Sequence, residues 1–174
     1  YLVDNILDSA KQKGTGKWTT QNSFDVGVPT PTINAAVTAR VMSGYKGERI
    51  EAAKTLKGVT RLKGIDRDTL VDSVRDALYA SVITSYAQGM ALMRRASGEY
   101  GYNLNLPEIA RIWKGGCIIR ARMLDPIKEA YRDDPKLPNM MVAPYFAELL
   151  DRLQQGWRLT VQTAADLGIP SLAL

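Results

Sequence analysis

The stretch that decides the fold is residues 66–97, DRDTLVDSVRDALYASVITSYAQGMALMRRAS, which predicts one long helix. Asp66 or Asp68 can cap its first turn, where a carboxylate also favours the positive end of the helix dipole. A glycine in mid-helix costs roughly 1 kcal/mol relative to alanine, so Gly89 predicts that a second helix packs closely there. We expect the buried stripe to consist of Leu70, Val74, Leu78, Ser81, Ser85, Gly89 and Leu92.

Helical spacing extends in both directions from this stretch, and no segment alternates enough to predict a strand. The sequence therefore predicts an all-α fold of about eight helices, some very short. A length of 174 residues and a mass of 19.2 kDa suit one domain, residues 1–174. The other expected helices are residues 1–12, 19–24, 31–44, 48–56, 107–113, 117–131, 144–154 and 156–167.

Local signals set the ends of these helices. Thr19 is an expected N-cap, and Pro31 and Pro107 suit a first helical turn, where a missing N–H costs nothing. Gly115-Gly116 predicts a sharp break. The expected apolar face of residues 1–12 is Leu2, Ile6, Leu7 and Ala10, and the expected core positions after the break are Ile118, Met123, Ile127 and Tyr131.

Composition excludes several kinds of site. The chain has no histidine, which removes every triad, metal site or pH switch that needs an imidazole. Its one cysteine, Cys117, excludes an internal disulfide and a cysteine-cluster zinc site, so we expect no metal. The absence of disulfides favours a reducing compartment, and we expect a cytoplasmic protein.

The net charge of +5 permits an anionic partner. Basic clusters could indicate nucleic acid, but acidic residues are interspersed among them, which favours solvated or internally paired arginines. The longest uncharged stretch has 17 residues and several polar side chains, too short for a bilayer span. The basic clusters are Arg94 with Arg95 and Arg120 with Arg122, and the acidic residues among them are Glu99, Asp125 and Glu129. The uncharged stretch is residues 77–93.

The most informative segment is residues 13–18, KGTGKW. Two glycines around a threonine, with flanking lysines, can form a phosphate or carboxylate cradle. The segment is not a Walker A loop, because Lys11 stands where that motif needs glycine and Trp18 stands where it needs Ser or Thr. The alternative is a helix C-cap with solvated lysines, which the spacing alone favours.

Two further features have both a functional and a structural interpretation. Arg40 could give a bidentate grip on an anion, or it could lay its stem over apolar neighbours at the surface. Gly115 and Gly116 could bring backbone close to a ligand. Cys117 lacks a histidine to activate it, so we interpret it as a buried thiol after a helix break.

These residues and their neighbours resemble the C-terminal helical part of 6-phosphogluconate dehydrogenase, a decarboxylating NADP enzyme of the pentose phosphate pathway and of gluconate utilisation. The resemblance covers nearly the whole chain in the right order. It rests on QKGTGKWT (12–19), GVP (27–29) with the helix that carries Arg40, GERIEAAK (47–54), ALYASVITSYAQGM (77–90), IWKGGCIIRARML (112–124) and GIP (168–170).

The resemblance implies that Lys13, Thr15 and Arg40 hold the phosphate of 6-phosphogluconate, which reverses the preference for a helix C-cap. It implies oxidation of the substrate by NADP, loss of carbon dioxide and formation of ribulose 5-phosphate. It also implies that residues 115–119 line the substrate pocket and that the helices form a homodimer interface. No nucleic-acid or membrane partner is implied.

The resemblance also marks what this sequence does not contain. The dinucleotide-binding domain, the lysine base and glutamate acid of the family, and the C-terminal tail with its arginine and histidine have no counterpart in residues 1–174. We therefore expect a fragment without catalytic residues, inactive by itself. The alternative is a non-catalytic helical dimerisation module derived from the same family.

Overall fold

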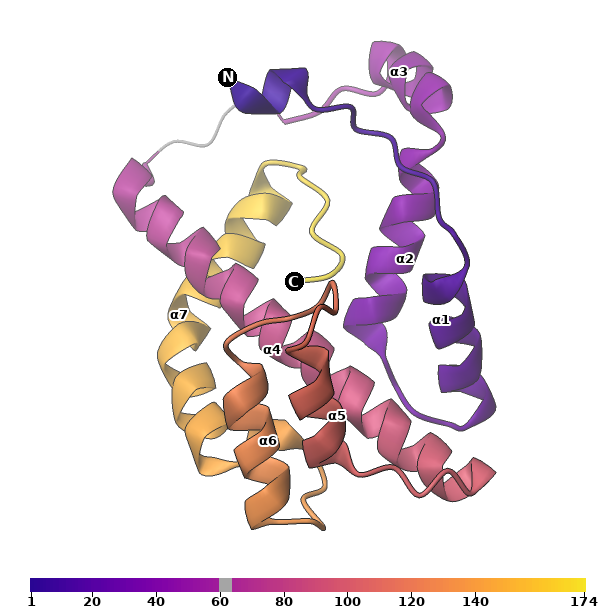
Figure 1. Ribbon diagram of the computed structural model, residues 1–174. Helices are drawn as coiled ribbons and strands as arrows, with labels where there is room; N and C mark the ends of the chain where they lie inside the picture. Colours follow the sequence, from indigo (N-terminus) through magenta and orange to yellow (C-terminus); the bar gives the residue numbers. More distant parts are fainter. Residues whose placement is uncertain (60–63) are drawn as a thin grey trace.

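A computed structural model describes residues 1–59 and 64–174 (Figure 1). Within these residues all regular secondary structure is helical and there is no strand, so the predicted all-α class is confirmed. The α-helices are α1 (Thr15–Asp25), α2 (Pro31–Ser43), α3 (Lys46–Thr55), α4 (Arg67–Tyr100), α5 (Leu106–Trp113), α6 (Leu124–Asp133) and α7 (Pro144–Asp166), and the 3-10 helices are η1 (Leu2–Asn5) and η2 (Met140–Val142).

Helix α4 is the longest of the described helices and runs diagonally through the structure in Figure 1. Its start is the predicted one, since the Asp66 carboxylate accepts a hydrogen bond of 2.9 Å from the backbone N–H of Thr69. Because that bond stabilises the ionised form, it lowers the pKa of Asp66. The helix ends at Gly101 with φ +67°, a left-handed C-cap that favours glycine.

The buried stripe of α4 agrees with the predicted one only in part, because Ser81 and Leu92 are buried as predicted but the other predicted positions are not. Leu78 is 61% exposed and Val74 is also exposed, whereas the other buried positions include the small residues Ser73, Ala77, Ala80 and Ala87 as well as Ile83 and Met90. Small side chains on α4 let α7 approach closely, and this contact outweighs the burial of larger apolar side chains. Gly89 is not the point of close approach, because a Cβ there would meet nothing within 4 Å.

The close approach occurs at Gly156 on α7. A Cβ at that position would lie 2.8 Å from the Asp76 Cβ and 3.1 Å from the Ser73 Cα. The prediction of two helices separated near residue 155 is therefore wrong, since α7 is continuous from Pro144 to Asp166. Gly156 serves the packing of α7 on α4 rather than a break between helices.

Helices α5 and α6 complete the core on one side of α4. Pro107 lies in the first turn of α5 as predicted, and Asn105 caps that helix through the N–H of Glu108. The core combines residues of α4 to α7 and η2, among them Ile83, Met90, Leu124, Ile127, Met140 and Phe146, all fully buried.

The segment before α6 is not the predicted helix. Residues 117–123 form turns, and α6 begins at Leu124. Pro126 explains the difference, because its ring would clash with the carbonyl of Arg122 if the helix extended further back. Met123, Ile127 and Tyr131 are buried as predicted, but Ile118 is 98% exposed.

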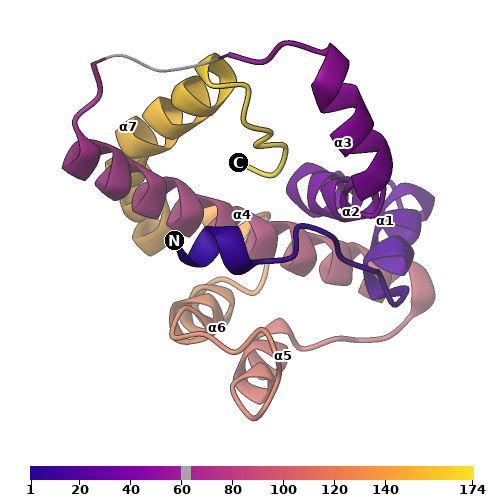
Figure 2. The ribbon, with the colours of Figure 1, turned by 90° about the horizontal axis from the view of Figure 1, so that it is seen from above.

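Helices α1 and α2 pack side by side and dock on the C-terminal half of α4 (Figures 1 and 2). The Arg95 Nε donates to the Val26 carbonyl in the turn between them (3.2 Å). The buried Gln88 of α4 accepts a hydrogen bond from the backbone N–H of Ile33 (3.2 Å), which belongs to the free first turn of α2. Helix α4 thus orients α2.

The N-terminal segment is largely extended, so the predicted helix over residues 1–12 is wrong. Only Leu2–Asn5 forms a 3-10 turn, and Leu2, Ile6 and Leu7 are exposed. A short helix is marginal unless its apolar face packs against something, and this face has no partner among the described residues.

Candidate functional site

The glycine-rich segment begins helix α1. Gly14 is the N-cap of this helix, with φ +116°, and its carbonyl accepts a hydrogen bond of 2.8 Å from the backbone N–H of Trp18. The predictions of a C-cap here and of an N-cap at Thr19 are therefore wrong. A side chain at Gly14 would be strained and would meet the Trp18 ring at 3.3 Å.

The N-cap at Gly14 places Lys13 and Thr15 at the N-terminal end of α1. Thr15 is the first residue of α1, and Lys13 directly precedes the N-cap. The N–H groups in the first turn of a helix lack intrahelical partners and lie at the positive end of the dipole. Both side chains are exposed, so the end of α1 offers donors, a hydroxyl and an ammonium group to an anion.

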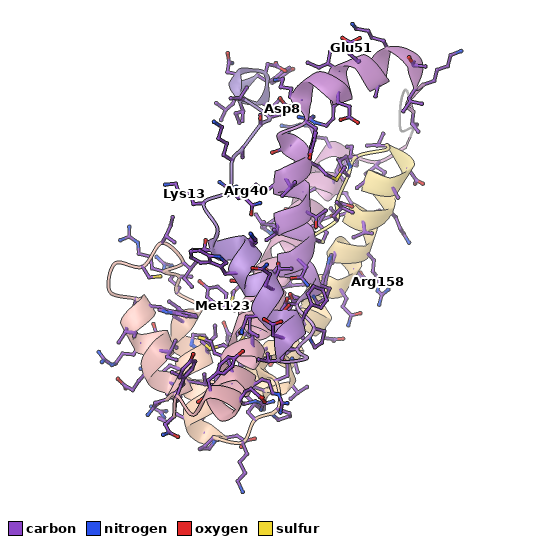
Figure 3. All side chains as sticks on the ribbon, turned by 90° about the vertical axis from the view of Figure 1, so that its right-hand side faces the viewer. Asp8, Lys13, Arg40, Glu51, Met123 and Arg158 are labelled. Carbon is purple, nitrogen blue, oxygen red and sulfur yellow. The ribbon has the colours of Figure 1, made fainter. Side chains whose placement is uncertain are left out.

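Arg40 lies on α2 beside the same end of α1. A Cβ added to Gly16 would approach the Val37 Cγ2 to 2.8 Å, so the first turn of α1 packs on Val37 of α2. Arg40 follows Val37 by about one helical turn on the same face of α2. Its Nε donates to the carbonyl of Lys11 at 2.8 Å. Figure 3 shows Lys13 and Arg40 on neighbouring segments.

The guanidinium of Arg40 keeps donors for another group. Its side chain is exposed, and its Nη1 and Nη2 atoms make no hydrogen bond to residues 1–59 or 64–174. The candidate site is therefore an open surface formed by the end of α1 and the side of α2. It combines two cations, one hydroxyl and a helix N-terminus, which suits a phosphate or carboxylate.

Residues 8–11 form a strap across α2 and α3 that the sequence patterns did not indicate. Asp8 pairs with Lys46 (2.5 Å) and Arg49 (3.0 Å), and the backbone N–H of Ala10 donates to the Ser43 Oγ (3.0 Å). Hydrogen bonds from Lys46 and Arg49 lower the pKa of Asp8 to about 2. Together with the bond from Arg40 to Lys11, the strap fixes the chain that leads to Lys13.

The loop between α5 and α6 is also held at defined points. Lys114 pairs with Asp125 at 2.6 Å across its base, which lowers the pKa of Asp125. The Tyr86 hydroxyl of α4 donates to the carbonyl of Ile119. Gly116 has φ +94° and forms the predicted break, whereas Cys117 is half-buried rather than fully buried.

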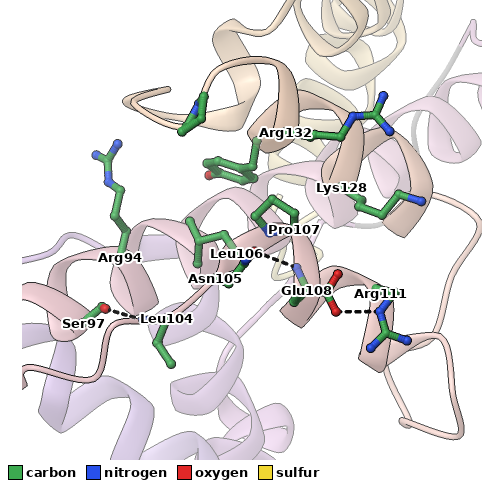
Figure 4. A pocket seen from close by; sticks show the side chains of 12 residues that line it. Arg94, Ser97, Leu104, Asn105, Leu106, Pro107, Glu108, Arg111, Lys128 and Arg132 are labelled. Carbon is green, nitrogen blue, oxygen red and sulfur yellow. Dashed lines mark hydrogen bonds and ion pairs between the residues drawn. The ribbon is translucent and has the colours of Figure 1, made fainter.

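A concave surface lies elsewhere, between the C-terminal part of α4, α5 and α6 (Figure 4), with a volume of about 770 Å³. Its charges are engaged within the protein. Arg111 pairs with Glu108 (2.7 Å), Arg132 pairs with Glu129, and Arg94 donates to the carbonyl of Leu137. Of the arginines predicted to be solvated or internally paired, Arg94 has this carbonyl partner and Arg95 pairs with Glu99 (3.5 Å), whereas Arg120 and Arg122 are exposed.

No group of three acidic, cysteine or histidine side chains capable of holding a metal ion occurs in residues 1–59 and 64–174. None of the described helices is both long and apolar enough to cross a bilayer.

The described residues form an all-helical domain, and its candidate site is the open surface at the start of α1. The family model of the 6-phosphogluconate dehydrogenase C-terminal domain matches residues 1–174. The chain therefore belongs to the 6-phosphogluconate dehydrogenase family and corresponds to this C-terminal domain.

Individual relatives agree with the family assignment. The chain is 55% identical over 170 residues to a decarboxylating 6-phosphogluconate dehydrogenase of Synechocystis and 51% identical over 170 residues to one of Schizosaccharomyces pombe. These matches cover 97% of this chain but only 35% and 34% of the relatives, so it spans about a third of their length.

A solved structure gives the same result. The Plasmodium falciparum 6-phosphogluconate dehydrogenase, studied in its apo form, with its cofactor NADP+ and with its substrate 6-phosphogluconate, superimposes with a TM-score of 0.91 at 39% identity. The superposition covers 99% of this chain and 38% of that chain.

Proposed function

We propose that this chain is the helical part of an NADP-dependent enzyme that converts 6-phosphogluconate to ribulose 5-phosphate and carbon dioxide. Its role there is to hold the phosphate of the substrate with Lys13, Thr15 and Arg40. The observation that carries the proposal is the bond from Arg40 to the carbonyl of Lys11. This bond brings the guanidinium to the segment that enters the N-terminus of α1.

A phosphate suits this surface better than a carboxylate does. A phosphate has three terminal oxygens, which can accept from a guanidinium, an ammonium group and the N–H groups of a helix N-terminus at the same time. The three proposed ligands come from two helices and the segment before one of them. Their separation along the chain means that only the folded protein assembles the site.

Binding the phosphate would contribute directly to the reaction. The phosphate is remote from the carbons that react, so its binding energy can position the hydroxyl and carboxylate groups of the substrate. Hydrogen bonds to charged groups are worth roughly 1.5–3 kcal/mol each. The site can therefore supply a large part of the substrate affinity without any catalytic residue of its own.

The residues of this chain do not fit the cofactor. A dinucleotide normally binds at the end of parallel strands, beside a glycine-rich turn, and the described residues contain no strand. We therefore assign NADP to parts of the enzyme that this chain does not span. We derive no catalytic step from the residues described here.

We further propose that the domain contributes to a homodimer interface. Val71, Val74 and Leu78 follow one another at helical spacing along α4, and all three are exposed. An exposed apolar stripe of this kind is typical of a surface that another protein covers. The same observation favours the second candidate function, a dimerisation module without an enzymatic role.

An assay of the intact enzyme tests the first proposal. With 6-phosphogluconate and NADP we expect NADPH absorbance to rise, and a folded intact protein that produces no NADPH would contradict it. Sedimentation tests the second candidate. A stable dimer in which neither 6-phosphogluconate nor inorganic phosphate binds would favour a dimerisation module, whereas saturable phosphate binding would favour the enzyme.

A further inference from the structure

The loop between α5 and α6 presents an exposed apolar tip on a tethered base. Ile118 is almost completely exposed and Ile119 is partly exposed, although the flanking Met123 and Leu124 are buried. The loop contains two adjacent glycines, Gly115 and Gly116, which leave its backbone free to adopt many conformations. A loop of this composition needs fixed contacts to hold one conformation.

Two contacts supply that restraint. At the base, the Lys114 Nζ lies 2.6 Å and 2.7 Å from the two carboxylate oxygens of Asp125. At the tip, the Tyr86 hydroxyl donates to the carbonyl of Ile119. The base contact joins two residues close in sequence, whereas the tip contact ties the loop to α4, the most extensively packed helix of the fold.

Tyr86 is well suited to act as a donor at this position. Its ring is partly buried and packs against the core, so its orientation is fixed. Burial, and secondarily the neighbouring Cys117, raises the pKa of the hydroxyl, so the group stays protonated at neutral pH. The Tyr86 hydroxyl donates a hydrogen bond to the carbonyl of Ile119, and no other side chain of the described residues donates to that carbonyl.

The position of Tyr86 on α4 adds a second argument. Gln88, two residues further along α4, accepts the N–H of Ile33 and thereby orients α2, which carries Arg40. The same short segment of α4 therefore holds both the proposed phosphate-binding helix and the loop.

We infer that Tyr86 is a positioning residue, whose hydroxyl holds residues 115–119 in a fixed position relative to α2 and its proposed substrate ligand Arg40. The part of this inference that concerns the substrate rests on the proposed function. The tether itself does not depend on it. Tyr86 acts through the backbone of Ile119 and is not a catalytic residue.

The tether is tested by the reactivity of Cys117, which lies within the loop and is half-buried. Tyr86→Phe removes only the hydroxyl and keeps the ring, and Tyr79→Phe on the same helix is the matched control. In the intact enzyme, the rate at which iodoacetamide modifies Cys117 is measured by mass spectrometry of the peptide that contains it. We expect a roughly two- to tenfold faster rate in Tyr86→Phe and no change in Tyr79→Phe.

Equal rates in all three proteins would overturn the tether, whatever the enzyme does. The link to the substrate is tested by kinetics of the same variants. We expect Tyr86→Phe to raise the KM for 6-phosphogluconate roughly two- to tenfold, with a smaller change in kcat. Faster modification of Cys117 with an unchanged KM would overturn the positioning role, and an inactive wild-type enzyme would refute the proposed function while leaving the thiol result valid.

Discussion

The Nε of Arg40 donates to the carbonyl oxygen of Lys11 at 2.8 Å, and the two residues are 29 positions apart in the sequence. The helix that carries the guanidinium therefore also fixes the segment that leads to Lys13. One side chain links the two halves of the proposed phosphate site. The remaining guanidinium nitrogens make no hydrogen bond to the described residues and are the ones that we propose a phosphate engages.

The strap over residues 8–11 predicts a specific pH dependence. The pKa of Asp8 is about 2 in the folded chain, compared with 3.8 for an unperturbed group. A depressed pKa means that the stabilisation is fully present above pH 3.8 and is lost as the pH falls through about 2. We expect the amide of Ala10 to remain protected from hydrogen exchange from neutral pH to about pH 4 and to lose protection below it.

The matched control for this experiment is Asp8→Asn. It removes the charge at every pH, so we expect weak protection of Ala10 that no longer depends on pH between 4 and 2. If Asp8→Asn lost protection over the same interval as the wild type, another group would be responsible. Protection in the wild type that persisted unchanged at pH 2 would also contradict the account.

Two glycines in mid-helix are expected to respond in opposite directions to the same substitution. Gly156→Ala places a Cβ 2.8 Å from the Asp76 Cβ and 3.1 Å from the Ser73 Cα, and we expect overpacking to lower the free energy of unfolding by about 1–3 kcal/mol. Gly89→Ala meets nothing within 4 Å, and we expect a gain of up to about 1 kcal/mol. Urea denaturation of both variants measures the difference.

The outcome separates two explanations of Gly156. If it serves close packing of α7 on α4, only Gly156→Ala is destabilising. If both substitutions stabilised the protein equally, helix propensity alone would govern these positions and the close contact would have no energetic importance.

Gln88 is expected to stabilise α2 from outside that helix. Gln88→Met keeps the volume but removes the oxygen that accepts the N–H of Ile33. Because this leaves a donor unpaired in a partly buried place, we expect a loss of about 1–3 kcal/mol in the free energy of unfolding. Gln154→Met, on the exposed side of α7, is the control and should change stability little. Equal effects of the two substitutions would argue against the contact.

The parts of the fold that depend on local chemistry were predictable from the sequence. The cap at Asp66 and the first-turn prolines, Pro31 and Pro107, are where they were expected. Each signal involves a side chain and a backbone group within one helical turn. No knowledge of the tertiary structure is needed to interpret it.

The errors arose where distant segments decide the outcome. Residues 1–12 have a helical apolar pattern, but no described element packs on it. The predicted stripe of α4 combines small and large residues, and the structure buries its Ser81 but leaves its Leu78 exposed, an outcome that depends on where α7 packs. Pro126 is a local signal against a helix over residues 117–123, although the apolar residues there have helical spacing.

The candidate site shows the same difference between local signals, which the sequence contains, and contacts between distant segments, which it does not reveal. Spacing alone favoured a C-cap for the glycine-rich segment, because glycine with positive φ is commoner at the end of a helix than at its start. The assignment of Lys13, Thr15 and Arg40 came from the family resemblance. The contacts among Arg40, Lys11, Val37 and Gly16 could not be inferred from sequence, since they depend on how α1 and α2 pack.

The central claim is that Arg40 binds the phosphate of the substrate. The most direct test removes the guanidinium by substitution and removes the phosphate by a change of ligand. Isothermal titration of the intact enzyme compares 6-phosphogluconate with gluconate, for the wild type and for Arg40→Ala. We predict that Arg40→Ala weakens 6-phosphogluconate roughly tenfold to a hundredfold and leaves gluconate almost unchanged. If the substitution weakened both ligands by the same factor, Arg40 would not act through the phosphate and the proposed site would be wrong.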